Sequence, residues 1–250
     1  IQGAISKLDA QNKEILFDDS TPLRYEYLVL ALGSDPAYFG IPGLKEYSIP
    51  LKSFENALHI RSTIRKKYDQ KQNGDSINIV VGGAGPAGVE FSAELIGYIK
   101  RLNKKSRKSI SPRVILVEGA PNILPGFSKR VISITGKHLI KNGVGIKPSS
   151  LISKVDENSV HLKSSIPSSA TSEEAISYDT LIWTGGVEAN ALTRTINLKE
   201  EKRGRIETDD CLQCISPDQH LDIAENMYAI GDNACFYNPQ TKIPVPGTAR

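Results

Sequence analysis

At residues 77–95 the chain reads Ile-Asn-Ile-Val-Val-Gly-Gly-Ala-Gly-Pro-Ala-Gly-Val-Glu-Phe-Ser-Ala-Glu-Leu. The apolar run over 77–81 predicts a buried strand, and residues 89–96 predict a helix. Between them, Gly83, Gly85 and Gly88 have the G-x-G-x-x-G spacing. A strand, a glycine-rich turn and a helix in this order are typical of a βαβ unit that binds a dinucleotide.

Each glycine has a physical role in such a turn. Gly83 permits the tight bend, Gly85 lets the backbone approach a pyrophosphate without a Cβ in the way, and Gly88 lets the helix pack on the strand. The helix N-terminus adds unpaired N–H groups and a positive dipole. We interpret Gly83, Ala84, Gly85, Pro86 and Gly88 as a dinucleotide-binding segment, and the alternative is a plain glycine-rich turn.

Glu118 follows the next predicted strand, Val114–Val117. A carboxylate there can accept both hydroxyls of an adenosine ribose and would repel a 2′-phosphate, so NADH is favoured over NADPH. It lies 30 positions after Gly88, against roughly 20 in the usual fingerprint. The basic segment Lys100–Lys108 can absorb the excess as a longer helix or a loop. The alternative is an ordinary polar strand end.

Alternating strands and helices around this unit predict an α/β fold with a parallel sheet and crossover helices. Ser53 and Ser128 are expected to open helices, the second ending at Lys141. Residues 151–178 are expected to form short antiparallel strands, and the first fifty residues are β-rich. The continuous apolar run Tyr27–Leu32 is typical of a strand buried on both faces.

Three further predicted strands end in small residues, where a cofactor can approach the backbone. Gly33 follows Tyr27–Leu32, Gly185 follows Thr180–Thr184, and Gly231 follows Met227–Ile230, expected to be the last strand. Asp232 comes next and can accept a hydrogen bond from a sugar or ribityl hydroxyl. Its other interpretation is a helix N-cap or turn residue.

Glu90 has two interpretations that the sequence alone leaves open. It is expected in the first turn of the phosphate-facing helix, where an acid complements the helix dipole. It could equally line the cofactor cleft.

Composition limits the remaining choices. The 250 residues carry a formal charge of +3, too small to indicate nucleic-acid binding, and no apolar run is long enough to span a bilayer. Cys211 and Cys214 form a C-x-x-C pair that we expect to be unpaired thiols, and no second pair has zinc-ligand spacing, so no metal is predicted. The N-terminus reads like the middle of a strand, so we expect the chain to begin inside a longer protein.

Taken together, these segments resemble the two-dinucleotide-binding-domain flavoproteins related to the pyridine nucleotide–disulfide oxidoreductases. The chain is most similar to the type II NADH:quinone oxidoreductases, which are single-subunit NADH dehydrogenases that do not pump protons. The segments that carry the resemblance are 23–34, 39–43 with 51–58, 83–95, 117–118 with 123–127, 183–185, and 228–232 followed by 246–249.

The resemblance implies an NADH domain inserted into a split FAD domain, with a parallel Rossmann-like sheet and an antiparallel β-meander. By this likeness residues 1–52 are late FAD domain, 53–75 a connecting helix and linker, 76–205 the NADH domain, and 206–250 the return to an incomplete FAD domain.

The same resemblance implies site roles. Asp232 would bind the FAD ribityl, Gly33 would lie near the flavin, and Glu90 would lie near the nicotinamide. Gly83, Gly85, Gly88 and Glu118 match the NADH site of these enzymes.

The implied reaction is hydride transfer from NADH to FAD, followed by electron transfer to a membrane quinone. Such an enzyme would be a peripheral protein at the cytoplasmic face of a membrane, or at the equivalent organelle face. It would touch the membrane through regions outside this chain, and a homodimer is compatible with the resemblance. The alternatives are another reductase of this superfamily (ferredoxin, disulfide or apoptosis-inducing-factor-like) and a non-catalytic NADH-binding module.

Overall fold

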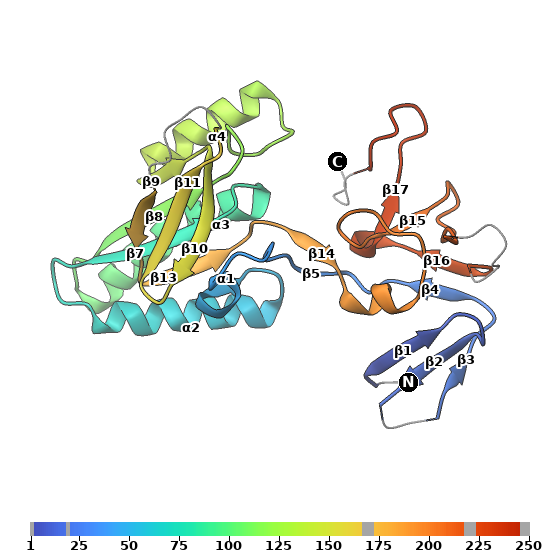
Figure 1. Ribbon diagram of the computed structural model, residues 1–250. Helices are drawn as coiled ribbons and strands as arrows, with labels where there is room; N and C mark the ends of the chain where they lie inside the picture. Colours follow the sequence, from blue (N-terminus) through green and yellow to red (C-terminus); the bar gives the residue numbers. More distant parts are fainter. Residues whose placement is uncertain (1–2, 19–20, 167–172, 218–223, 246–250) are drawn as a thin grey trace. The chain divides into compact units, whose positions relative to one another are not determined.

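The computed structural model describes residues 3–18, 21–166, 173–217 and 224–245 (Figure 1). The chain divides into two compact units. Unit 1 comprises Ile1–Asp35 and Val187–Arg250, and unit 2 comprises Pro36–Gly186.

Unit 2 contains a five-stranded sheet in which every neighbouring pair is parallel, as expected for crossover connections. In spatial order its strands are β6 (Ser48–Pro50), β13 (Thr180–Trp183), β7 (Ser76–Gly82), β8 (Ser111–Val117) and β9 (Val144–Lys147). Strand β7 is apolar and almost wholly buried because both faces of the sheet are covered.

Successive side chains of these strands feed two separate cores. Ile79, Val81 and Ile182 join the core beneath the three long helices, whereas Val80 and Leu181 join the core beneath an antiparallel meander. The helices are α2 (Phe54–Gln70), α3 (Pro86–Ser106) and α4 (Lys129–Lys141). On the other face lie the short helix α1 (Leu44–Tyr47) and strands β10 (Ser150–Asp156), β11 (Ser159–Ser164) and β12 (Glu174–Ser177).

The predicted helix starts are confirmed. Ser53 caps α2 in a capping box: its Oγ accepts from the Asn56 N–H at 3.2 Å, and its own N–H donates to Asn56 Oδ1 at 3.1 Å. Ser128 caps α4 by accepting from the Val131 N–H. The basic segment from Lys100 extends α3 to Ser106, and this 21-residue helix accounts for the long spacing before Glu118.

Unit 1 is built from short strands. An antiparallel sheet contains β1 (Ile5–Asp9), β2 (Glu14–Phe17) and β3 (Leu23–Arg24). The two-stranded sheets join β4 (Leu28–Leu30) to β16 (Met227–Ala229), β15 (Ile206–Thr208) to β17 (Ala234–Phe236), and β5 (Ser34–Pro36) to β14 (Val187–Ala189). Two short 3₁₀ helices, η1 (Ala191–Thr195) and η2 (Gly231–Asn233), complete the unit.

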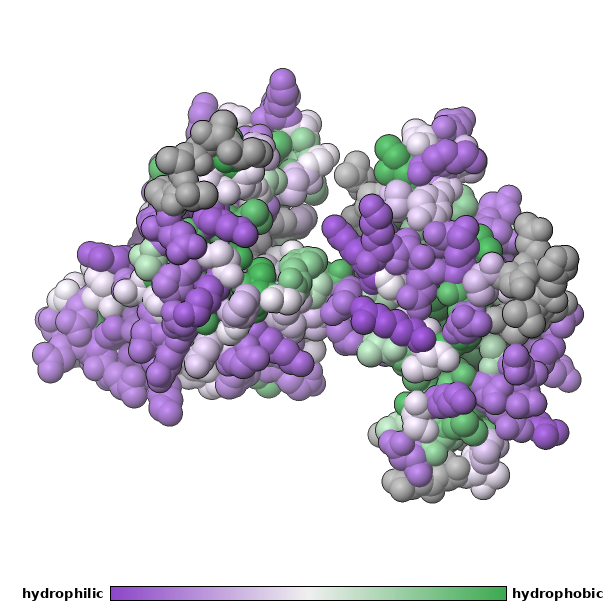
Figure 2. Space-filling view, viewed as in Figure 1, coloured by the Kyte–Doolittle hydropathy of each residue, from purple (hydrophilic) through white to green (hydrophobic). Residues whose placement is uncertain are grey.

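Two expectations for unit 1 were wrong. Strand β4 is not buried on both faces: Leu30 is 2% exposed, but Val29 is 55% exposed. In its two-stranded sheet with β16, one face packs on the unit's core, and Val29 on the other face reaches solvent. Figure 2 shows some hydrophobic (green) residues on the surface of this unit. The strand at Met227 is also not the last, because β17 follows it.

The compact units divide after residues 35 and 186, and the boundaries at 52, 75 and 205 stay predictions for the cofactor domains. Residues 36–75 belong to unit 2, because β6 pairs with β13 and because Ile60, Ile64 and Tyr68 of α2 are buried in its core. Residues 187–205 belong to unit 1. The helix expected as a connector is therefore a structural layer of unit 2.

None of the helices formed by the described residues is both long enough and apolar enough to cross a membrane.

Candidate functional site

The glycine-rich turn lies where the sequence predicted, between the end of β7 and the start of α3. Gly85 is the N-cap of α3 and Pro86 its first residue. Gly83 has φ of +104°, a conformation that side chains with a Cβ rarely adopt. The Gly83 N–H donates to the Val117 carbonyl at 2.8 Å, which ties the turn to β8.

The three glycines meet very different surroundings. A Cβ on Gly83 would lie 2.5 Å from the Gly185 Cα, and one on Gly88 would overlap the Gly83 carbonyl oxygen. A Cβ on Gly85 would meet no protein atom within 4 Å. Gly83 and Gly88 are thus required by packing, whereas the backbone at Gly85 is open to a ligand.

Glu118 lies directly beside this turn. Its Oε2 accepts from the Ala84 N–H at 2.7 Å, and its Oε1 accepts from the Ala120 N–H at 2.8 Å. Each carboxylate oxygen can still accept another hydrogen bond, for example from a ribose hydroxyl. The turn and the predicted acid therefore come together, although the two bonded residues are 34 positions apart in the sequence.

A cavity of about 160 Å³ opens next to Glu118. Its lining combines this carboxylate with mainly apolar side chains and glycines. The lining residues are Phe39, Ile41, Gly83, Val117, Glu118, Gly119, Ser150, Leu151, Ile152, Trp183 and Gly185. A mainly apolar cavity with a carboxylate at its edge suits a planar base attached to a sugar.

An aromatic pair forms one wall of this cavity. Trp183 is buried and its Nε1–H donates to the Ala37 carbonyl at 2.9 Å, which fixes the indole. Phe39 packs against it edge-to-face, with ring centroids 6.4 Å apart, yet remains 61% exposed. Sequence reasoning did not assign either residue to the site. The Phe39 signal was weak, because a single aromatic residue in a Pro/Gly loop has no distinctive spacing.

Thr184 is another residue that sequence reasoning missed. Its Oγ1 lies 2.8 Å from the Gly83 carbonyl and 3.0 Å from that of Gly82, and donates to this turn. Gly185 follows with its Cα against Gly83, and any Cβ there would collide with the Trp183 indole. The end of β13 therefore supports the glycine turn. A hydroxyl residue directly after a buried strand was the available signal.

Glu90 is exposed and is the fifth residue of α3. The first turn of this helix holds no acid, so the expectation that Glu90 complements the helix dipole there was wrong. The cause is that the helix begins at Pro86 rather than near Val89. Its role near a nicotinamide stays a prediction.

In unit 1, Gly33 and Gly231 follow parallel strands β4 and β16, so both lie at the carboxyl ends of paired strands. Both have positive φ (+68° and +74°), and a Cβ on either would meet nothing within 4 Å. Asp232 lies beside them, and its Oδ2 accepts from the Ser34 hydroxyl at 2.8 Å. Adjacent Asn233 is fully buried and donates to the Leu30 carbonyl, which anchors the segment. Asp232 lies within η2 rather than at its N-cap, which is Ile230.

The cysteines are free thiols, as predicted for Cys211 and Cys214. Cys211 is exposed, whereas burial raises the pKa of the Cys214 thiol to about 12.

Comparison with known proteins adds sequence and structural relatives. The type II NADH:quinone oxidoreductase of Staphylococcus haemolyticus is 30% identical over 256 residues, which cover 100% of this chain and 60% of that protein. The NADH dehydrogenase-like protein YutJ of Bacillus subtilis is 28% identical over 234 residues, covering 93% and 56%. The chain thus spans less than two thirds of the length of these curated relatives.

Among solved structures, NDH2 from Plasmodium falciparum in complex with NADH superposes with a TM-score of 0.81 at 23% identity, covering 94% of this chain and 50% of that one. This similarity confirms the α/β flavoprotein-type fold expected from the sequence. A family model described as pyridine nucleotide-disulphide oxidoreductase matches residues 1–249. The chain therefore belongs to the pyridine nucleotide-disulphide oxidoreductase family.

Proposed function

We propose that unit 2 binds NADH at the turn formed by Gly83, Gly85 and Gly88. The observation that carries this proposal is the Glu118 carboxylate held by the Ala84 N–H beside the open backbone of Gly85. In this arrangement the α3 N-terminus would receive the pyrophosphate, and Glu118 would accept the adenosine ribose hydroxyls. A 2′-phosphate would meet the Glu118 charge, so NADH is preferred to NADPH.

We propose that FAD is bound by unit 1, with Asp232 accepting a hydrogen bond from a ribityl hydroxyl. The residues present suit this role, because the Ser34 hydroxyl orients the carboxylate and the glycines at 33 and 231 leave open space next to their backbones. When bound, the flavin would accept a hydride, which is the two-electron redox chemistry that the proposed reaction needs.

We infer that the whole enzyme oxidises NADH and passes the electrons to a membrane quinone. Its support is the similarity to relatives named type II NADH:quinone oxidoreductase and NADH dehydrogenase-like protein. Glu90 would position the nicotinamide, because the hydride step needs alignment rather than a proton donor. A quinone acceptor would place the enzyme at a membrane face, as a peripheral protein.

The NADH site can be tested by titrating the purified chain with NADH and following the Trp183 fluorescence. We expect Glu118→Gln to weaken NADH binding about tenfold, because its amide cannot accept from both backbone N–H groups and the ribose. The wild type should bind NADPH more weakly than NADH, and the variant should lose this preference. Glu157→Gln, an exposed glutamate on the β10–β11 turn, is the matched control.

The proposal fails if Glu118→Gln, with its thermal stability measured alongside, binds NADH as the wild type does. The acceptor needs a separate assay on the full-length protein. NADH oxidation with a soluble quinone analogue should exceed oxidation with ferredoxin or a disulfide. A protein without flavin absorbance would instead be a non-catalytic NADH-binding module.

A further inference from the structure

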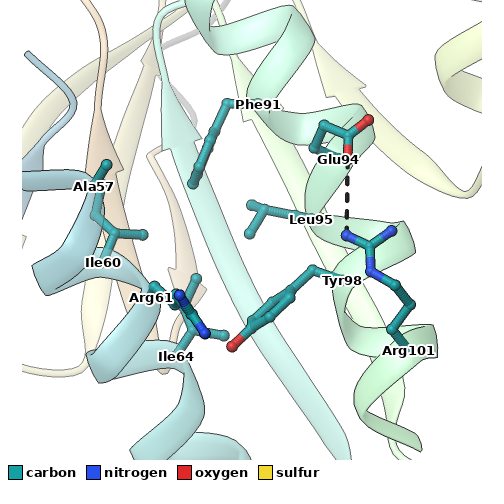
Figure 3. A pocket seen from close by; sticks show the side chains of 9 residues that line it. All are labelled: Ala57, Ile60, Arg61, Ile64, Phe91, Glu94, Leu95, Tyr98 and Arg101. Atoms are coloured by element: carbon teal, nitrogen blue, oxygen red, sulfur yellow. Dashed lines mark ion pairs between the residues drawn. The ribbon is translucent and has the colours of Figure 1, made fainter. Parts of the chain in front are cut away.

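Helices α2 and α3 enclose an apolar groove on the helical face of unit 2. The hollow has a volume of about 180 Å³. Its floor contains Ile60, Ile64 and Leu95, all at least 97% buried, and Phe91 forms a wall. Figure 3 shows Phe91, Leu95 and Tyr98 on α3 pointing toward Ile60 and Ile64 on α2. None of these residues lines the cavity beside Glu118.

The two helices are fastened together near their C-terminal ends. The Tyr68 hydroxyl of α2 lies 2.9 Å from Asn103 Oδ1 and 2.6 Å from Ser106 Oγ of α3. The groove lies toward the N-terminal side of this junction, since its lining residues on both helices precede Tyr68 and Asn103. It is therefore a gap between two anchored helices.

The edges of the groove are cationic. Arg61 is exposed at its mouth and forms no ion pair with any described residue. Arg101 lies 3.9 Å from Glu94, but both side chains are more than 60% exposed, so water screens this pair. Figure 2 shows hydrophilic side chains over much of the surface around α2.

A second hollow of about 390 Å³ continues from the first and shares Arg61 and Tyr98 with it. It adds Lys105, which forms no ion pair among the described residues, and Arg65, which is paired with Asp69 at 2.9 Å. The combined lining thus holds four cationic side chains and one carboxylate, with two of the cations unpaired.

This combination selects one ligand chemistry. A purely polar anion would leave the partly exposed apolar lining at Ala57, Phe91 and Tyr98 against water. A neutral apolar molecule would gain nothing from the exposed charges of Arg61 and Lys105. We propose that the groove binds a single-chain anionic amphiphile, an acyl carboxylate, with its chain over the apolar floor and its carboxylate between Arg61 and Lys105. The proposal does not depend on the NADH site.

The test is calorimetric titration of the purified chain with dodecanoate, below the concentration at which it forms micelles. We expect one dodecanoate to bind per chain. Acetate lacks the apolar chain and dodecanol lacks the charge, so each should bind at least about tenfold more weakly than dodecanoate. Raising the salt concentration should weaken dodecanoate and leave dodecanol unchanged. Absence of dodecanoate binding, or equal binding of dodecanol, would overturn the proposal.

Two variants locate the site. Arg61→Gln should weaken dodecanoate binding about tenfold, whereas Lys66→Gln, an exposed cation of α2 that lines neither hollow, should leave it unchanged. Ala57→Trp, checked for wild-type circular dichroism, should fill the groove and abolish binding. If Arg61→Gln and Lys66→Gln lose the same dodecanoate affinity, the ligand is held by general charge attraction, and the groove is rejected as its site. If the wild type and Ala57→Trp bind dodecanoate with equal affinity, and also bind anionic vesicles equally, the ligand adsorbs to the charged surface. This outcome would also reject the groove as the binding site.

Discussion

At the scale of single residues, Gly85 and Gly88 belong to one motif but have separable roles. Gly88→Ala should destabilise the chain by about 1–3 kcal/mol, because the new methyl group overlaps the Gly83 carbonyl and displaces the turn. Gly85→Ala should leave stability nearly unchanged, because φ at this residue is −67° and the methyl group meets open space. Urea unfolding of both variants measures the difference.

The same pair separates folding from binding. Gly85→Ala should bind NADH far more weakly than the wild type while remaining folded, because the methyl group occupies the space that the pyrophosphate needs. If Gly85→Ala keeps wild-type NADH affinity, the turn is a structural bend and not a phosphate site. If Gly88→Ala is as stable as the wild type, the packing role of Gly88 is wrong.

The thiols give a second test at this scale. Alkylation requires the thiolate, and burial raises the pKa of Cys214 to about 12 and also raises that of Cys235. Iodoacetamide at mildly alkaline pH should therefore modify Cys211 first, as measured by peptide mass spectrometry. In denaturant all three should react. Modification of Cys214 as fast as Cys211 in the native chain would contradict the buried environment.

Only those site residues that belong to a spaced motif or follow a predicted strand could be predicted from the sequence. Spacing identified the three glycines, and the end of a strand identified Glu118. The Ala84–Glu118 hydrogen bond depends on β8 lying beside β7. The support from Thr184 depends on β13 lying on the other side of β7, a pairing between residues about 100 positions apart. Sequence periodicity carries no information on that pairing, so Thr184 was missed.

At the scale of elements, the junction between α2 and α3 depends on one buried hydroxyl. Tyr68 is fully buried, and Tyr68→Phe removes its contacts with Asn103 and Ser106. We expect a loss of about 1–2 kcal/mol in the free energy of unfolding, measured with urea. Tyr47→Phe is the control, since Tyr47 is 45% exposed and should change stability by less than about 0.5 kcal/mol. Equal effects of both changes would contradict this account.

Elements with strong local signals were predictable, and those set by neighbours were not. Ser53 fixes the start of α2, and a serine directly before an apolar helical stripe is a start signal that the sequence shows. The burial of that helix against the sheet was not visible, because it depends on β6 joining β13. The apolar run around Val29 predicted two covered faces, but its surroundings provide one. The apolar composition of a strand shows that the strand can be buried. It does not show which other elements cover each of its faces.

At the scale of the whole molecule, the two units differ in how the chain builds them. Unit 2 is one continuous segment, Pro36–Gly186, with its own sheet and a core on each face, whereas unit 1 is assembled from two distant segments. A continuous segment with a complete core can fold alone. We therefore expect fragment 36–186 to unfold cooperatively and to bind NADH with an affinity close to that of the 250-residue chain, without binding FAD.

The comparison fragment is 76–205. Its ends are those that the sequence analysis predicted for the NADH domain, and they differ from the ends of the compact unit. It keeps Gly83, Gly85, Gly88 and Glu118 but lacks α2 and β6, so β13 becomes an edge strand and the core loses Ile60, Ile64 and Tyr68. We expect this fragment to lack a cooperative thermal transition and to bind NADH poorly. If 76–205 folds and binds as well as 36–186 does, then α2 and β6 are dispensable and the boundaries of the NADH-binding unit lie where the motif alone places them. Circular dichroism melting and NADH titration of the two fragments, side by side, distinguish these outcomes.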